Sequence, residues 1–114
     1  MGTFEQRKAI RFNVELAAEI LTSNEVLAAS TKNLSETGVC LELSKTLEEG
    51  SLVGLSLFLT NEGIEDPDKE QLNVKAQVIW CSENEGLGFT VGARFSDLDE
   101  ASRKALEDFF AAIG

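Results

Sequence analysis

The sequence contains no histidine, only one proline and one tryptophan, and only two cysteines. Without histidine, the commonest general base and one of the usual zinc ligands are missing. Cys40 and Cys81 lie far apart and form no Cys-x-x-Cys pair, so we expect no structural metal. General acid–base and nucleophilic mechanisms also lack their usual members. The composition therefore predicts a protein that is not an enzyme and that carries no cofactor.

Long apolar runs are also missing. No segment approaches the roughly 20 apolar residues that a transmembrane helix needs. The first residues, MGTFEQRKAIRF, carry charges where a signal peptide would have its apolar core. We therefore expect a cytoplasmic protein with reduced thiols and no direct membrane insertion.

Basic residues are outnumbered, because ten Lys and Arg stand against twenty Asp and Glu, a formal net charge of −10. This balance opposes attraction to nucleic acid or to anionic membranes, so we expect no nucleic-acid partner. Screening limits the reach of distant charges to about 8 Å at physiological salt. A local cluster of cations can still bind a small anion. The one clearly basic stretch is residues 1–11, where Arg7, Lys8 and Arg11 face only Glu5.

The hydrophobic pattern of the 114 residues predicts a single, mainly β domain. Six segments show the alternating or continuous apolar pattern of β-strands, bounded by turn residues: residues 10–21, 26–34, 39–43, 52–60, 72–80 and 88–95. Apolar residues then recur at three- and four-residue intervals, which predicts an amphipathic helix over residues 98–113. Ser96 and Asp99 resemble a capping box at its start.

Two arginines at the N-terminus form the first candidate site. Arg7 and Arg11 are four residues apart, so they project to the same side of an extended or a helical segment. The guanidinium group pairs bidentately with phosphate, and also with O6 and N7 of guanine. The pair can therefore hold a phosphate and a guanine edge. The alternative interpretation is two solvated surface charges.

The second candidate site is the Asn-x-Ser-x-x-Gly pattern of Asn33, Ser35 and Gly38, where a predicted strand ends. Asn and Ser commonly hydrogen-bond a local turn, and Gly permits a positive φ, so a purely structural turn explains the spacing. Alternatively, Asn33 and Ser35, as alternate residues of a strand, point the same way toward a ligand. An amide and a hydroxyl can then meet a guanine edge.

Together these motifs are similar to those of a known family. RKAIR, with NLSETG some twenty residues downstream, resembles the Arg-x-x-x-Arg and Asp/Asn-x-Ser-x-x-Gly signatures of the PilZ family. Three further features fit the pattern of this family: Gly50, the strand end VIW at Trp80, and GARF at residues 92–95. The resemblance therefore covers nearly the whole chain. It implies one domain over residues 1–114. A six-stranded antiparallel β-barrel, residues 9–95, precedes the C-terminal α-helix, and a flexible arm, residues 1–8, folds over cyclic di-GMP.

The resemblance also implies roles for these residues. Arg7 and Arg11, with Lys8 between them, would contact phosphate and guanine. Asn33 and Ser35 would hydrogen-bond guanine, and Gly38 would shape the loop. The implied function is a bacterial receptor that transmits the cyclic di-GMP signal to an unidentified protein partner in motility, polysaccharide or biofilm control. We expect a monomer or weak dimer. An adaptor of the same fold that binds no nucleotide is the alternative.

Four positions need separate comment. Gln6 stands where many members carry another arginine that is linked to capture of a stacked ligand dimer. The sequence is therefore compatible with either one or two bound ligands per protomer. Asn33 replaces the commoner Asp, exchanging a carboxylate for an amide with one acceptor and two donors. Trp80 can stack beside a nucleotide, although its alternation phase predicts packing in the core or at the barrel rim. Arg94 is a candidate peripheral contact, with solvation or ion pairing as the alternative.

Overall fold

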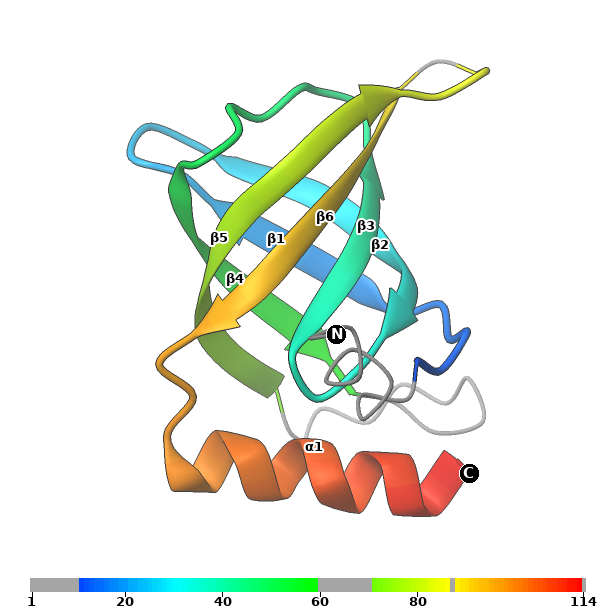
Figure 1. Cartoon of the computed structure of the whole chain (residues 1–114), viewed down its shortest axis with the longest axis vertical. Helices are drawn as coiled ribbons and strands as arrows, with labels where there is room; N and C mark the ends of the chain where they lie inside the picture. Colours follow the sequence, from blue (N-terminus) through cyan, green and yellow to red (C-terminus); the bar gives the residue numbers. More distant parts are fainter. Residues whose placement is uncertain (1–10, 60–70, 87, 114) are drawn as a thin grey trace, which may run out of the picture.

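The computed structural model describes residues 11–59, 71–86 and 88–113 and shows a closed β-barrel followed by one helix (Figure 1). Every neighbouring pair of strands is antiparallel, and the strand order around the barrel is β1-β2-β3-β6-β5-β4. The predicted fold is therefore confirmed. The elements are β1 Ala17–Leu21, β2 Val26–Leu34, β3 Gly38–Leu43, β4 Leu52–Phe58, β5 Gln71–Glu83, β6 Phe89–Ser96 and α1 Glu100–Ile113.

The core lies inside the barrel, because alternate residues of each strand point to its axis. The inward side chains are almost all aliphatic, and several are completely buried, among them Ile20, Leu41, Leu57 and Val91. Each such side chain contributes about 1.5–3 kcal/mol by leaving water. The structure therefore relies on apolar packing within the barrel.

β1 is shorter than the strand predicted over residues 10–21. The buried hydroxyl of Thr31 in β2 accepts a hydrogen bond from the backbone N–H of Leu16 at 2.8 Å and donates one to the carbonyl oxygen of Val14. The backbone N–H of Thr31 still donates to the carbonyl oxygen of Leu16 at 2.9 Å, but the side chain takes the place of the other backbone partner. This happens beside a bulge in β2, where the register shifts between Thr31 and Asn33. Pairing resumes only at the isolated bridge between Phe12 and Leu34.

The helix begins two residues later than predicted, and Ser96 does not cap it. Ser96 is the last residue of β6, and Asp97 then adopts a positive φ of 61° that turns the chain toward α1. The true cap is Asp99, whose Oδ1 accepts a hydrogen bond from the backbone N–H of Ser102 at 2.8 Å. Asp97 can take this conformation because Asp tolerates the left-handed region better than most residues.

Helix α1 lies across one open end of the barrel (Figure 1). Its buried side chains are Leu106, Phe109 and Phe110. The ring of Phe110 stacks on that of Phe12, with centroids 4.5 Å apart and planes inclined by 10°. The helix is thereby joined to the segment that leads into β1. Within the described residues, no helix has the length and apolarity needed to cross a membrane.

The Asp99 cap makes a testable contribution to acid stability. The hydrogen bonds from Ser102 lower the pKa of Asp99 below its ordinary value of 3.8. A carboxyl group whose pKa is lower when folded stabilises the fold above its unfolded pKa, and the contribution is lost as the pH falls through the folded value. We expect Asp99→Asn to lower the melting temperature slightly at pH 7, with the difference shrinking below about pH 4.

The measurement is thermal unfolding followed by circular dichroism from pH 7 to pH 2. Glu107→Gln, on the exposed side of the same helix, controls for the loss of one charge. A difference between Asp99→Asn and wild type that stays constant over the whole pH range would contradict this assignment.

Candidate ligand-binding groove

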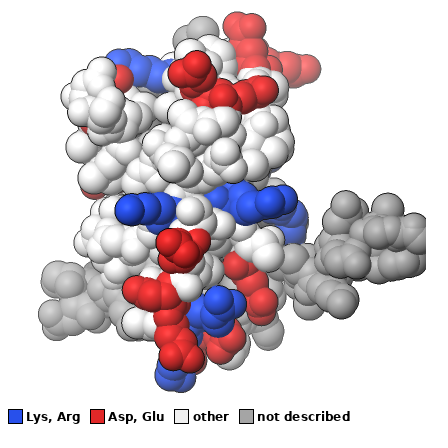
Figure 2. Space-filling view, turned by 60° about the vertical axis from the view of Figure 1, so that its left-hand side comes forward, with Lys and Arg blue, Asp and Glu red and all other residues white. Residues whose placement is uncertain are grey.

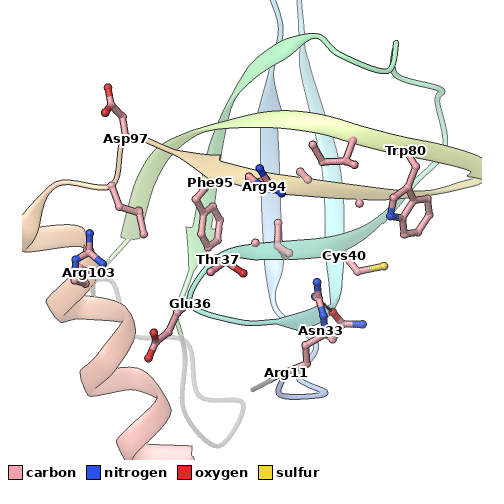
Figure 3. Close-up of a pocket in the computed structure, with 16 residues that line it drawn as sticks. Arg11, Asn33, Glu36, Thr37, Cys40, Trp80, Arg94, Phe95, Asp97 and Arg103 are labelled. Carbon is pink, nitrogen blue, oxygen red and sulfur yellow. Dashed lines mark hydrogen bonds between the residues drawn. The ribbon is translucent and has the colours of Figure 1, made fainter. Parts of the chain in front are cut away.

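A groove of about 980 Å³ crosses the outer surface of the barrel over β3, β6 and β5 and reaches the start of α1 (Figure 3). Its lining combines three arginines, two carboxylates, a tryptophan and the backbone of two glycines. The arginines are Arg11, Arg94 and Arg103. Such a mixture of cations, hydrogen-bonding groups and one aromatic face suits an anionic, aromatic ligand.

One cross-strand row forms the floor of the groove. Asn33 of β2 pairs with Cys40 of β3, Cys40 pairs with Gly92 of β6, and Gly92 pairs with Trp80 of β5. Adjacent strands lie about 4.8 Å apart, so three steps give a floor roughly 14 Å wide. Four strands that are distant in sequence therefore supply one continuous surface.

Trp80 belongs to this outer surface, and the expectation that it packs in the core or at the rim is wrong. β5 has a bulge between Val78 and Trp80, where the register against β6 shifts. The extra residue, Ile79, reverses the alternation that places Val78 in the core. The exposed fractions of Ile79 and Trp80 are accordingly 46% and 42%.

Gly92 leaves the space that the side chain of Trp80 occupies. A Cβ added at Gly92 would lie 2.2 Å from Nε1 of Trp80 and 2.4 Å from its Cε2. Only glycine lets the indole ring lie this close to the backbone of β6. The ring therefore forms one wall of the groove and keeps a face for a planar ligand.

Arg11 and Asn33, both predicted from the sequence, lie side by side in the groove. Arg11 Nη1 donates a hydrogen bond to Asn33 Oδ1 at 2.7 Å. The backbone bridge between Phe12 and Leu34 places the two residues next to each other. This hydrogen bond uses one of the five donors of the guanidinium group and fixes its direction, so the remaining donors can meet a ligand.

Gly38 also lines the groove, but not for the predicted reason. The glycines with positive φ in the described part of the chain are Gly50 and Gly88, so Gly38 does not need left-handed backbone. Instead, a Cβ on Gly38 would lie 2.4 Å from the carbonyl oxygen of Ala93. Glycine is needed here because β3 and β6 approach closely opposite Arg94.

Ser35 takes the structural role that the sequence left open. Its side chain is fully buried, and its Oγ accepts hydrogen bonds from the backbone N–H groups of Thr37 and Gly38, each at 3.2 Å. Because β2 ends at Leu34, Ser35 is not an alternate strand residue beside Asn33, and the expectation that both point the same way is wrong. Ser35 instead holds the turn that brings Gly38 into β3. A direct contact between Ser35 and a ligand remains a prediction.

Two further groove residues were not identified from the sequence. Cys40 lies in the floor, and burial raises the pKa of its thiol while the charges of Lys32 and Arg11 act in the opposite direction. The thiol therefore stays neutral at physiological pH. Its position two residues after Gly38, on the same face of β3, was the available signal. Arg103 comes from α1, and no local motif marked it.

Gln6, Arg7 and Lys8 lie outside the described residues. Their roles therefore remain the predictions made from the sequence.

The charges around the groove differ from the acidic average of the chain. The groove lining holds three arginines and two carboxylates. On the face drawn in Figure 2, Lys and Arg side chains lie across the middle, and Asp and Glu side chains lie above and below, together with further Lys and Arg. In residues 11–59, 71–86 and 88–113, no carboxylate lies within 4.0 Å of Arg11, Arg94 or Arg103. Lysines elsewhere do form ion pairs, such as Lys45 with Glu25 at 3.1 Å. Among the described residues, the groove arginines thus have no carboxylate partner that an anionic ligand would have to displace.

The sequence matches the model of the PilZ domain over residues 5–112. No protein with a curated description matches it. Among solved structures, the Bacillus subtilis inhibitor of motility, MotI/DgrA, is 18% identical, with a TM-score of 0.75 over 95% of this chain and 49% of the other.

Two structures of Escherichia coli YcgR are also similar. YcgR in complex with c-di-GMP is 18% identical, with a TM-score of 0.75 over 95% of this chain and 46% of the other. The PilZ domain of YcgR with c-di-GMP is 16% identical, with a TM-score of 0.73 over 95% of this chain and 92% of the other. The chain thus spans about half the length of MotI/DgrA and of the longer YcgR structure. At these identities the likeness establishes the fold.

Proposed function

This chain belongs to the PilZ domain family, and on that premise we propose that it is a receptor for cyclic di-GMP. The ligand lies in the outer groove, held by Arg11, Asn33 and Gly38 and by the N-terminal residues Arg7 and Lys8. The observation that carries this proposal is the hydrogen bond from Arg11 to Asn33 at the edge of the groove floor. Two structures similar to this chain contain c-di-GMP, which supports the same ligand class.

The chemistry of the groove fits a cyclic guanine dinucleotide. The ligand carries two phosphate charges and two planar bases. The fork of donors on Arg11 suits either a phosphate or the O6 and N7 atoms of guanine. The amide of Asn33 offers one acceptor and two donors at close range, and the indole of Trp80 offers a stacking face. A floor roughly 14 Å wide accommodates more than one of these groups at once.

The proposed role is binding and signalling, without catalysis. Ligand binding orders the N-terminal arm, residues 1–8, over the barrel and creates a surface that a partner protein recognises. The similarity to an inhibitor of motility supports motility as one output, with polysaccharide or biofilm control as others. The partner is a protein, and the receptor acts as a monomer or weak dimer in the cytoplasm.

The single tryptophan provides a direct test, because Trp80 lines the groove. We expect its fluorescence to change saturably on titration with cyclic di-GMP and to remain unchanged with cyclic di-AMP, which lacks the guanine O6 acceptor. Trp80→Phe should abolish the optical signal, while calorimetry still detects binding.

Thermal unfolding gives an independent measurement. A ligand at 100 times its dissociation constant should stabilise the folded state by about 2.7 kcal/mol. Absence of both heat and a thermal shift at saturating cyclic di-GMP would refute the receptor and favour the nucleotide-independent adaptor.

A further inference from the structure

The groove continues beyond the motif residues to the C-terminal helix. From Gly92, the outer face of β6 continues through Arg94 to Ser96, two residues at a time, which spans roughly 13 Å. Beyond β6 the lining consists of Asp97 and Leu98 and then Arg103 of α1. In Figure 3, Arg103 and Trp80 lie at opposite ends of the groove. A ligand that occupies only the end near Arg11 and Trp80 would leave this second end empty.

We propose that Arg103 forms a second anion-binding subsite, which takes a phosphate of the bound cyclic dinucleotide and thereby ties helix α1 to the ligand. This inference rests on the proposed function and names a part of the same groove. A cyclic dinucleotide has two phosphates on opposite sides of its ring, so cations at two separated positions match its charge distribution. Arg11 supplies the first cation, and Arg103 supplies the second.

The position of Arg103 is fixed by the turn between β6 and α1. Asp97 turns the chain with its φ of 61°, and Asp99 caps the helix through Ser102. The backbone N–H of Arg103 donates to the carbonyl oxygen of Asp99 at 3.0 Å, which places Arg103 in the first helical turn. The side chain therefore starts from a defined point beside the end of β6. Closing on a ligand therefore costs the side chain less conformational entropy.

Lys104, the next residue, differs from Arg103 in its ion pairing and in its position relative to the groove. It forms an ion pair with Asp108 at 3.6 Å and is not part of the groove lining. Arg103 lines the groove and has no described carboxylate within 4.0 Å. Two adjacent cations of the same helix thus have different surroundings, and of the two only Arg103 lines the groove.

The groove carboxylates Glu36 and Asp97 lie near this helical end. Their charges restrict the subsite to an anion that also makes specific contacts, because a free phosphate would gain little beside two carboxylates. A ligand that Arg11 already holds has lost its translational and rotational freedom. Its second phosphate therefore meets Arg103 at a high effective concentration.

The test compares Arg103→Ala with Lys104→Ala by calorimetric titration of cyclic di-GMP into the full chain. We expect Arg103→Ala to weaken binding about tenfold, as for loss of one charge-assisted hydrogen bond at an exposed site. Lys104→Ala should bind as the wild type does, although it removes the same charge. Arg103→Ala should also flatten the salt dependence of affinity. Matching circular dichroism spectra would establish that both variants are folded.

Hydrogen exchange provides a second readout. Cyclic di-GMP should slow exchange of the amides of residues 101–104 in the wild type and in Lys104→Ala, but not in Arg103→Ala. Equal affinity and equal protection in Arg103→Ala and the wild type would overturn the helical subsite. If binding then still fails in Arg11→Ala, the proposed receptor function survives. If the wild type itself shows no binding, the receptor and the subsite both fail.

Discussion

Replacing Arg11 with alanine is expected to weaken the binding of cyclic di-GMP about 100-fold while the barrel remains folded. Hydrogen bonds that involve a charged group are worth about 1.5–3 kcal/mol each, and a guanidinium fork can make two of them to one phosphate or one guanine edge. Every 1.4 kcal/mol changes the dissociation constant tenfold. Arg11 is exposed and contributes no side chain to the core, so its removal should leave the melting temperature nearly unchanged. Calorimetric titration gives both the affinity and the stoichiometry.

Three variants separate the explanations for such a loss. Lys45→Ala removes an equal charge from a residue that does not line the groove and should bind normally. Arg11→Lys retains the charge but loses the planar fork, so it should recover only part of the affinity. Asn33→Ala removes the acceptor that orients Arg11 and should cost less than loss of Arg11 itself. If Arg11→Ala and Lys45→Ala weaken binding equally, the contact is a general charge effect and the proposed site is wrong.

Gly38→Ala is expected to lose far more stability than alanine substitutions at Gly86 or Gly92. The added Cβ would lie 2.4 Å from the carbonyl oxygen of Ala93, which belongs to the backbone of β6. Neither atom can move without separating β3 from β6, because Gly38 is paired directly with Arg94. Overpacking of this kind costs about 1–3 kcal/mol. We expect a loss near the upper end and a decrease in melting temperature of roughly 10 °C.

Two other glycines provide a graded control in the same unfolding experiment. At Gly86 the nearest atom to an added Cβ is 4.0 Å away, so Gly86→Ala should be almost neutral. At Gly92 the obstacle is the exposed side chain of Trp80, which can rotate away at small cost to stability. Gly92→Ala should therefore impair ligand binding more than folding. A Gly38→Ala protein as stable as Gly86→Ala would show that β3 and β6 do not pack as closely as described.

The period of the apolar residues was sufficient to predict six strands and the helix, and the resemblance to the PilZ family added the closed barrel. The period could not predict bulges, because two residues opposite one on the next strand leave no mark in the composition of a single strand. The bulge between Val78 and Trp80 therefore reversed the expected orientation of Trp80. Similarly, the hydroxyl of Thr31 interrupts the pairing of the segment before β1, although its sequence alternates without a break.

The candidate site was predictable where its residues belong to a local motif. Arg11 and Asn33 came from two separate patterns, and the structure places them in one hydrogen bond. Arg103 could not be found in this way, because its place in the groove depends on the left-handed turn at Asp97 and on the direction of α1. The need for glycine at position 38 likewise depends on the neighbouring strand, and no local spacing encodes the distance between β3 and β6.

The strand order also determines when the barrel can close during folding. β6, the last of the six described strands in chain order, lies between β3 and β5 and bonds to both. A growing chain that has not yet emerged past residue 96 has two strand edges exposed and no closed core. Such non-local pairing is slow to form, since the loop entropy is lost before the contacts are gained. The chain must therefore be made as far as β6 before the floor of the groove, which includes Gly92, can form.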